Sequence, residues 1–195
     1  VDFETLKLMK QANCKQIIYG FESGSQRILS MLKNNTTTLE QNKQAVESTK
    51  KAGILACGSF MIGSPGETEE EIAMTKRFII ENDLAGFGAT VTTPFPGTKL
   101  WKMCEEKGII PRKIDWSNFN LGKLTFALSD IPKEKMEKIH DDFLNLLLER
   151  NPGTNPKNIL KVSIKHPAKA IKRVFKSPKH VLTILKRLLK ENKYF

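Results

Sequence analysis

Two segments place polar and turn-forming residues directly after apolar runs. The segment 22–25, Glu-Ser-Gly-Ser, follows the short run 15–20, and the segment 63–68, Gly-Ser-Pro-Gly-Glu-Thr, follows the run 54–62. Ligands of parallel sheets lie beyond the carboxyl ends of the strands, where carboxylate and hydroxyl groups can bind them. We therefore interpret 58–68 as the strand-to-helix corner of an active site. The alternative is a plain strand-to-helix connection whose glycines serve only its geometry.

The run 54–62 is too apolar for a strand with one exposed face, so it predicts a parallel strand buried on both faces. Thr68 and Glu71 have the spacing of a capping box, and three glutamates occupy the first turn that would follow. This pattern predicts a helix from 69 to about 83, because the helix dipole favours negative charge at its start.

Similar patterns predict helices and strands along the first 150 residues. They predict helices near 3–12, 25–32, 38–52, 98–107 and 132–150, and further strands at 15–20 and 87–93. The helix near 38–52 begins with a second capping box, formed by Thr38 and Gln41. Alternating strands and helices favour an α/β fold with a parallel sheet. Residues 109–130 are interpreted as an ordered connection over that sheet.

Composition fits a globular protein: 39% of the 195 residues are hydrophobic and 27% are charged. No apolar run approaches the roughly 18 residues of a membrane span, so the cytoplasm is the expected compartment. Cys14, Cys57 and Cys104 are far apart in sequence, and each is expected to be a small buried apolar residue. No metal ligands are predicted in this chain.

The net charge of +11 is concentrated at one end. Residues 151–195 hold 12 Lys or Arg against one acidic residue, whereas 1–150 hold 20 of each sign. Prolines repeat every eleven residues in this basic tail, and each opens a segment of amphipathic helical type. Such a tail is suited to an anionic membrane surface, or it packs as a helical lid on the rest of the chain. Nucleic-acid binding is not expected, because aromatic residues do not alternate with the basic ones.

Several nucleotide and hydrolase motifs are absent. The sequence has no GxxxxGK[ST] loop, no GxGxxG and no G-x-S-x-G elbow. His140, His166 and His180 lie in the predicted long helix and the tail, and they are expected to be surface or packing residues.

Five motifs in order together resemble the radical S-adenosylmethionine (SAM) enzymes. The likeness is greatest to the subgroup with an N-terminal cobalamin-binding domain, similar to the magnesium-protoporphyrin oxidative cyclase, and it covers about residues 5–150. The motifs are 20–25 (GFESGS), 32–33 with the threonines 36–38, 52–54 (AGI), 60–68 (FMIGSPGET) and 93–98 (TPFPGT).

The resemblance implies a partial TIM-type barrel of six strand-helix units, of which this chain would hold the fourth to sixth strands. Residues 1–108 would form this half-barrel, 109–150 a connection and long helix, and 151–195 the basic helical tail. The resemblance also implies residues that bind SAM. The first strand end would lie near the ribose and methionine of SAM, and Lys33 would face the SAM carboxylate. The second strand end would flank the adenine, and the third would line the pocket. These residues are Glu22, Ser23, Gly24, Lys33, Ile62, Gly63, Pro94, Phe95 and Pro96.

The resemblance further implies a [4Fe–4S] cluster held by a CxxxCxxC loop, and this sequence has no such loop. We therefore expect the chain to be the C-terminal part of a longer enzyme, with the missing N-terminal half as its partner. Alone it is predicted neither to hold a cluster nor to cleave SAM. The intact enzyme, with SAM, the cluster and cobalamin, would use a 5′-deoxyadenosyl radical to methylate, cyclise or rearrange a small or lipid-like substrate. The sequence does not indicate catalytic residues. The alternative is a non-catalytic α/β binding module with a membrane-surface tail.

Overall fold

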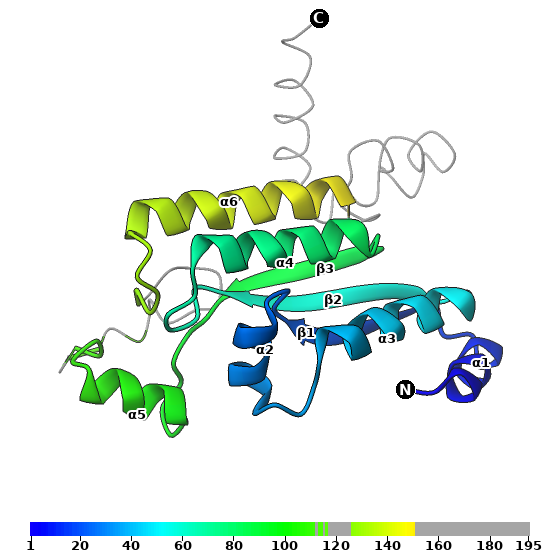
Figure 1. The fold of residues 1–195 in the computed structure, drawn as a ribbon, viewed down its shortest axis with the longest axis horizontal. Helices are drawn as coiled ribbons and strands as arrows, with labels where there is room; N and C mark the ends of the chain where they lie inside the picture. Colours follow the sequence, from blue (N-terminus) through cyan, green and yellow to red (C-terminus); the bar gives the residue numbers. More distant parts are fainter. Residues whose placement is uncertain (112, 115, 117–125, 151–195) are drawn as a thin grey trace, which may run out of the picture. The chain divides into compact units, whose positions relative to one another are not determined.

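The computed structural model describes residues 1–111, 113, 114, 116 and 126–150 (Figure 1). Strands and helices alternate through most of this part, as the sequence patterns predict. The helices are α1 (Phe3–Gln11), α2 (Gln26–Lys33), α3 (Leu39–Lys51), α4 (Glu69–Glu81), α5 (Lys99–Glu106) and α6 (Lys133–Arg150), and the strands are β1 (Gln16–Glu22), β2 (Leu55–Ile62) and β3 (Gly86–Val91).

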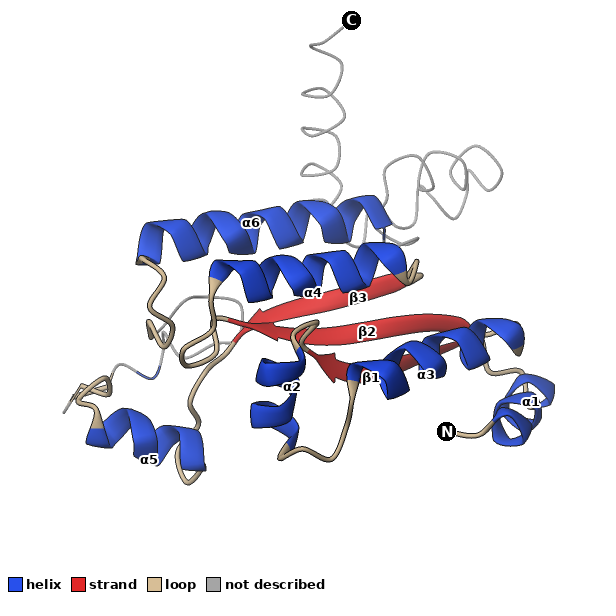
Figure 2. Cartoon of the chain, viewed as in Figure 1, coloured by secondary structure: helices blue, strands red, loops and turns tan. Residues whose placement is uncertain are grey.

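The three strands form one sheet in the order β1-β2-β3, and both strand pairs are parallel. All three arrowheads in Figure 2 therefore point to the same side of the molecule. This confirms the predicted α/β class, and the arrangement is consistent with part of a β/α barrel. The loops that leave the strands toward α2, α4 and α5 start from that one edge.

Aromatic side chains form the core on one face of the sheet. Phe21 and Phe60 project from β1 and β2 against Phe78 of α4, with ring centroids 5.5 and 6.0 Å from it. Phe87 of β3 meets Phe143 of α6 at 6.4 Å. The face that carries these rings is thus covered by α4 and α6, which run alongside the strands in Figure 1.

The opposite face of β2 corrects one prediction. Residues alternate along this strand between buried and partly exposed positions: Leu55 is exposed, and Cys57, Ser59 and Met61 are half-buried. The strand is therefore buried on one face only within the part that the structure describes. The apolar run suggested two buried faces, but composition cannot show whether a second layer covers the sheet.

Both predicted capping boxes are confirmed. The Thr38 and Thr68 side chains accept hydrogen bonds from the backbone N–H groups of Gln41 and Glu71, whose own side chains accept from the Thr38 and Thr68 N–H groups. The start of α4 is fixed by this exchange, and with it the loop that joins β2 to α4.

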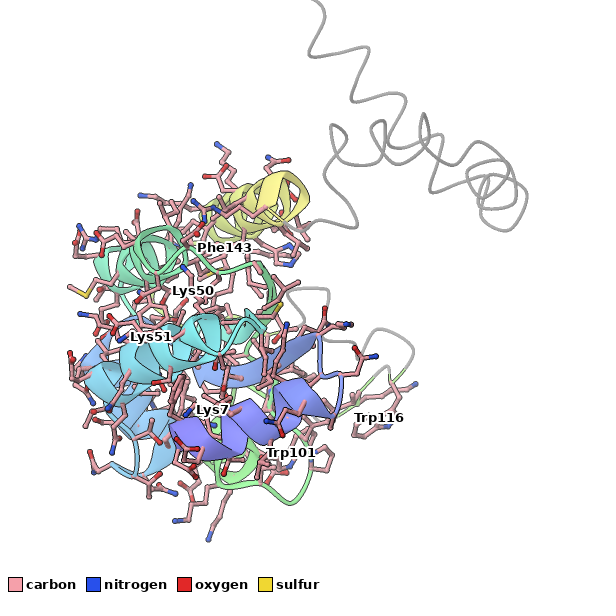
Figure 3. The ribbon with its side chains drawn as sticks, turned by 90° about the vertical axis from the view of Figure 1, so that its right-hand side faces the viewer. Lys7, Lys50, Lys51, Trp101, Trp116 and Phe143 are labelled. Atoms are coloured by element: carbon pink, nitrogen blue, oxygen red, sulfur yellow. The ribbon has the colours of Figure 1, made fainter. Side chains whose placement is uncertain are left out.

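The connection after β3 is described only in part. Cys104 of α5 is buried with Phe126 and Leu128, while Trp101 stacks on Trp116 with ring centroids 6.1 Å apart (Figure 3). Much of the predicted connection over the sheet, including 117–125, lies outside the described residues.

By compactness the chain divides into one unit, Val1–Leu146, and a second, Leu147–Phe195. The basic tail predicted at 151–195 lies outside the described residues, as do His166 and His180, so its membrane contact stays a prediction. Among the described helices, none combines the length and the apolar character that crossing a membrane requires.

Candidate functional site

The predicted site residues follow the three strand ends at one edge of the sheet. Glu22 is the last residue of β1 and Ile62 the last of β2, while Pro94 to Pro96 follow β3 in the loop before α5. The N–H of Thr92 donates to the Ile62 carbonyl at 2.8 Å, which continues the pairing just beyond β3. The structure therefore brings these corners to a common rim, where parallel sheets bind ligands.

Glu22 has an unusual backbone conformation. The register of β1 against β2 shifts between Gly20 and Glu22, and Glu22 has a φ of 61°. A non-glycine residue in the left-handed region costs about 1 kcal/mol or more, and such positions cluster at binding sites. A bulge at a strand end re-aims the side chain that follows it.

The Glu22 carboxylate forms an ion pair with Lys33, the last residue of α2. Its Oε1 is 2.8 Å from the Lys33 ammonium, and both side chains are partly buried. A Cβ built at Gly20 would lie 2.7 Å from Glu22 Oε1 and 3.5 Å from Lys33 Nζ, so the ion pair lies over Gly20. Two residues that were predicted separately are thus in direct contact.

Ser23 and Gly24 hold the β1 corner against α4. A Cβ at Gly24 would come within 2.5 Å of the Met74 carbonyl oxygen, and the Gly24 N–H donates to Thr75 Oγ1 at 2.9 Å. The buried Ser23 hydroxyl lies 3.3 Å from the same Thr75 oxygen and accepts from the Ser25 N–H at 3.1 Å. These contacts give both residues a packing role, and their contact with SAM stays a prediction.

The corner after β2 is closed by internal hydrogen bonds. Gly63 has a φ of 74°, which glycine adopts without strain. The N–H of Ser64 donates to Glu67 Oε2 at 2.9 Å, and the Ser64 hydroxyl lies 3.0 Å from Thr92 Oγ1 beyond β3. The second and third corners are therefore joined by hydrogen bonds as well as by strand pairing.

Glu67 is a buried carboxyl group with an unmet acceptor. It is 1% exposed, and among the described residues its Oε1 has no hydrogen-bond donor. Burial raises the pKa of Glu67 to about 7, although the backbone N–H groups of Ser64 and Gly63 oppose that rise. The β2 corner thus contains a carboxyl group that titrates near neutral pH.

Glu71 lies in the first turn of α4, four residues after Glu67, and its pKa is shifted in the opposite direction. Hydrogen bonds from Arg27, with further donors at Thr68 and Ser25, hold the pKa of Glu71 at about 2. Sequence analysis identified the capping role of Glu71 but neither this pairing nor the burial of Glu67. No local pattern signals an arginine that reaches a glutamate 44 positions away.

The loop after β3 supplies the remaining predicted residues. Phe95 is 45% exposed, and its carbonyl accepts a hydrogen bond from the Thr98 N–H at 3.1 Å, next to the start of α5. Pro94, Phe95 and Pro96 therefore lie on the loop that leaves the same rim, and their role as pocket lining stays a prediction.

The described residues do not fit an iron–sulfur cluster. Cys14, Cys57 and Cys104 are free thiols on separate elements, and no three potential metal ligands gather in the part of the chain that is described. Only Cys104 is fully buried, so the expected burial of Cys14 and Cys57 is only partial. Burial raises the pKa of the Cys57 and Cys104 thiols, which disfavours the thiolate that binds iron.

Small residues lie on the sheet face that carries the Glu22 and Lys33 pair. Gly20, Ser59 and Gly88 are paired across the three strands, and a Cβ built at Gly88 would meet no atom within 4 Å. Among the described residues this row leaves free space at Gly88, while the Glu22 and Lys33 pair already lies over Gly20. A carboxylate and an ammonium are groups that can bind the hydroxyls and the carboxylate of SAM.

Comparisons with known proteins show similarity to radical SAM enzymes. A family model described as the radical SAM superfamily matches residues 1–79, the part that contains the first two corners. An uncharacterized methyltransferase of Pyrococcus horikoshii is 30% identical over 171 residues, which make up 87% of this chain and 36% of that protein.

Two further relatives have names that specify a reaction. The anaerobic magnesium-protoporphyrin IX monomethyl ester cyclase of Cereibacter sphaeroides is 30% identical over 121 residues, which are 61% of this chain and 19% of the cyclase. The bacteriochlorophyllide d C-8(2)-methyltransferase of Chlorobaculum tepidum is 28% identical over 120 residues, 61% of this chain and 26% of that enzyme. The chain thus spans about a third or less of the length of these relatives.

Proposed function

The chain belongs to the radical SAM superfamily, and from that premise we propose that it forms part of the SAM-binding surface of an enzyme that methylates or cyclises its substrate. The names of the relatives support methylation and cyclisation ahead of rearrangement. The main observation behind the proposal is the ion pair between Glu22 and Lys33. It lies at the end of β1, where Glu22 itself adopts the left-handed backbone conformation.

Each side chain of this pair has a distinct role in the proposal. The Glu22 carboxylate accepts hydrogen bonds from the ribose hydroxyls of SAM, and the Lys33 ammonium pairs with its carboxylate. The bulge at the end of β1 sets the direction of Glu22 before SAM arrives, which lowers the ordering cost of binding. At the neighbouring strand end the Ile62 side chain is 0% exposed and belongs to the core, so contact with the adenine would fall to the backbone of the β2 corner.

Membership of the superfamily implies both SAM and a [4Fe–4S] cluster. Bound SAM would supply the hydrogen-abstracting chemistry, with the electron coming from the cluster. The described residues do not fit the cluster, and the sequence has no CxxxCxxC loop, so we propose that the cluster's ligands come from polypeptide outside these 195 residues. The same polypeptide would carry the cobalamin that a methyl transfer uses, in keeping with the subgroup that the sequence resembles. The contribution of this chain is to bind SAM, orient it and keep water away from it.

SAM binding by the chain tests the first part of this proposal. Equilibrium dialysis with labelled SAM is expected to show binding that weakens about tenfold in Glu22→Gln and in Lys33→Met, the loss expected for one hydrogen bond to a charged group. Lys50→Met is the matched control, because Lys50 pairs with Asp83 on an exposed surface. Equal weakening by the control, or no binding to the native chain, would contradict the proposal.

The prediction that this chain alone holds no cluster is tested separately. Anaerobic reconstitution with iron and sulfide, followed by a one-electron reductant, is expected to leave added SAM intact. One cluster per chain together with release of 5′-deoxyadenosine would show that the ligands are present after all.

A further inference from the structure

Arg27 extends from α2 to two other elements. Its Nε donates to Glu71 Oε1 at 2.8 Å, and its Nη2 contacts Glu71 Oε2, so the guanidinium engages both oxygens of the carboxylate. The same Nη2 donates to the Gly66 carbonyl at 2.7 Å. One side chain thus contacts both α4 and the turn that precedes it.

Glu71 in turn contacts both of the first two corners. Its Oε1 accepts from the Ser25 hydroxyl at 2.9 Å, next to the β1 corner, and its Oε2 accepts from the Thr68 N–H at 3.0 Å in the β2 corner. One turn along α4, Thr75 Oγ1 accepts from the Gly24 N–H. The two corners, residues 22–25 and 63–68, are therefore attached to the same face of α4.

We propose that Arg27 and Glu71 are positioning residues that fix the β1 and β2 corners relative to each other, so that Glu22 and Gly63 are presented to one ligand. We call this pair the corner clamp. The inference rests on the proposed function, because it assigns the support of the SAM site to residues that do not themselves touch SAM.

The geometry favours this role over general stabilisation. A guanidinium that binds both oxygens of a carboxylate fixes orientation as well as distance, which a lysine cannot do. Glu22 lies only three residues before Ser25, and its left-handed conformation persists only where the surrounding structure holds it. Loss of the clamp is expected to free that corner while the strands remain paired.

The chain offers a matched control for this pair. Arg77 and Glu70 form another arginine–glutamate pair on α4, at 2.7 Å, but both side chains are exposed. Arg77→Met therefore removes a similar ion pair from the same helix without touching either corner.

Amide hydrogen exchange tests the clamp without SAM. In Arg27→Met, the amides of Gly24 and Ser64 are expected to lose about tenfold or more of their protection, the loss expected when a hydrogen bond to a charged group is removed. Amides in the centre of β2 should keep theirs, and Arg77→Met should change neither. Arg27→Lys should restore only part of the protection, because it keeps the charge and loses the two-point contact. The clamp would be overturned if Arg27→Met reduced the amide protection of Ser64 but not of Gly24. It would also be overturned if Arg27→Lys restored the protection of both amides in full.

SAM affinity then tests the positioning role. Equilibrium dialysis is expected to show about tenfold weaker binding in Arg27→Met and an intermediate value in Arg27→Lys, with Arg77→Met unchanged. Loosened corners with unchanged affinity would overturn the positioning role. If the native chain bound no SAM, the proposed function would fail, and the exchange experiment would still decide whether the clamp fixes the corners.

Discussion

Glu67 and Glu71 lie four residues apart around the start of α4, and both residues are buried, yet their pKa values are displaced in opposite directions. The pKa of Glu67 is raised to about 7 by burial. That of Glu71 is held at about 2, chiefly by hydrogen bonds from Arg27. The position relative to the helix is similar, so neither burial nor the helix dipole alone accounts for the difference.

The difference lies in the donors that each carboxylate meets. Both oxygens of Glu71 accept from side-chain donors and one also accepts a backbone N–H, whereas Glu67 accepts the Ser64 N–H on one oxygen and leaves the other without a donor among the described residues. A buried carboxylate is stabilised as an anion only when donors replace the lost water. The two glutamates therefore contribute to stability in different pH ranges.

The largest expected effect comes from removing the paired carboxylate. Glu71→Leu keeps the approximate volume but leaves the Ser25 hydroxyl and the Thr68 N–H without their acceptor, so we expect the free energy of unfolding to fall by about 3 kcal/mol. Urea denaturation measures this. Glu70→Leu, one residue earlier and exposed, should change it by no more than about 0.5 kcal/mol. Equal losses in the two variants would mean that burial of the carboxylate does not matter.

Glu67→Gln should remove a pH dependence. A folded-state pKa of about 7, above the usual 4.5, means that the folded protein binds this proton more tightly than the unfolded chain does. Its stabilising contribution is therefore fully present below about pH 4.5 and is lost as the pH rises to about 7. Between pH 5 and 8, the variant should gain about 2 kcal/mol relative to the native chain, measured by urea denaturation at both values.

The pKa of about 2 for Glu71 means that the neighbouring carboxylate does not account for the pH dependence expected between pH 5 and 8. A lowered pKa gives stability that is present above about pH 4.5 and is lost only as the pH falls toward 2. Glu71 therefore does not titrate between pH 5 and 8. An unchanged pH profile in Glu67→Gln would show that the Glu67 carboxyl finds a donor or water in solution.

Thr68→Ala tests the capping hydroxyl of Thr68 separately from the Thr68 backbone N–H, which also donates to Glu71. The substitution removes the hydroxyl that accepts the Glu71 N–H at 3.3 Å and lies 3.2 Å from Glu71 Oε2, but it keeps the Thr68 N–H. We expect a loss of about 1 kcal/mol, typical of an N-cap, and a small rise in the pKa of Glu71, followed by carboxyl NMR titration. A pKa of Glu71 near its usual value would mean that the hydroxyl, and not Arg27, is the main donor.

Local sequence patterns predicted the elements well because their causes are local. The capping boxes at Thr38 and Thr68 need only a partner three residues away, and the alternation of strands and helices follows from spacing and turn residues. The donors of Glu71 could not be predicted in this way, because Arg27 is 44 residues from it in sequence and meets it only through the tertiary structure. Among the described residues, the prediction that β2 is buried on both faces was wrong for a related reason. Apolar composition shows that a strand can be buried, but whether a second layer covers it depends on the tertiary structure. The contact between Glu22 and Lys33 likewise depends on a bulge that no residue pattern announced.

The smallest effect is expected at the neighbouring exposed pair. Arg77 lies 2.7 Å from Glu70, close to the separation of Arg27 from Glu71, but the side chain of Glu70 is 67% exposed and that of Glu71 is 11% exposed. Water therefore already solvates Glu70, and Arg77→Met should change the free energy of unfolding by less than about 0.5 kcal/mol. Added salt should leave that small difference smaller still, because exposed pairs are screened. A loss close to that of Glu71→Leu would mean that charge pairing on α4, rather than the desolvation of one carboxylate, accounts for the contribution of Glu71.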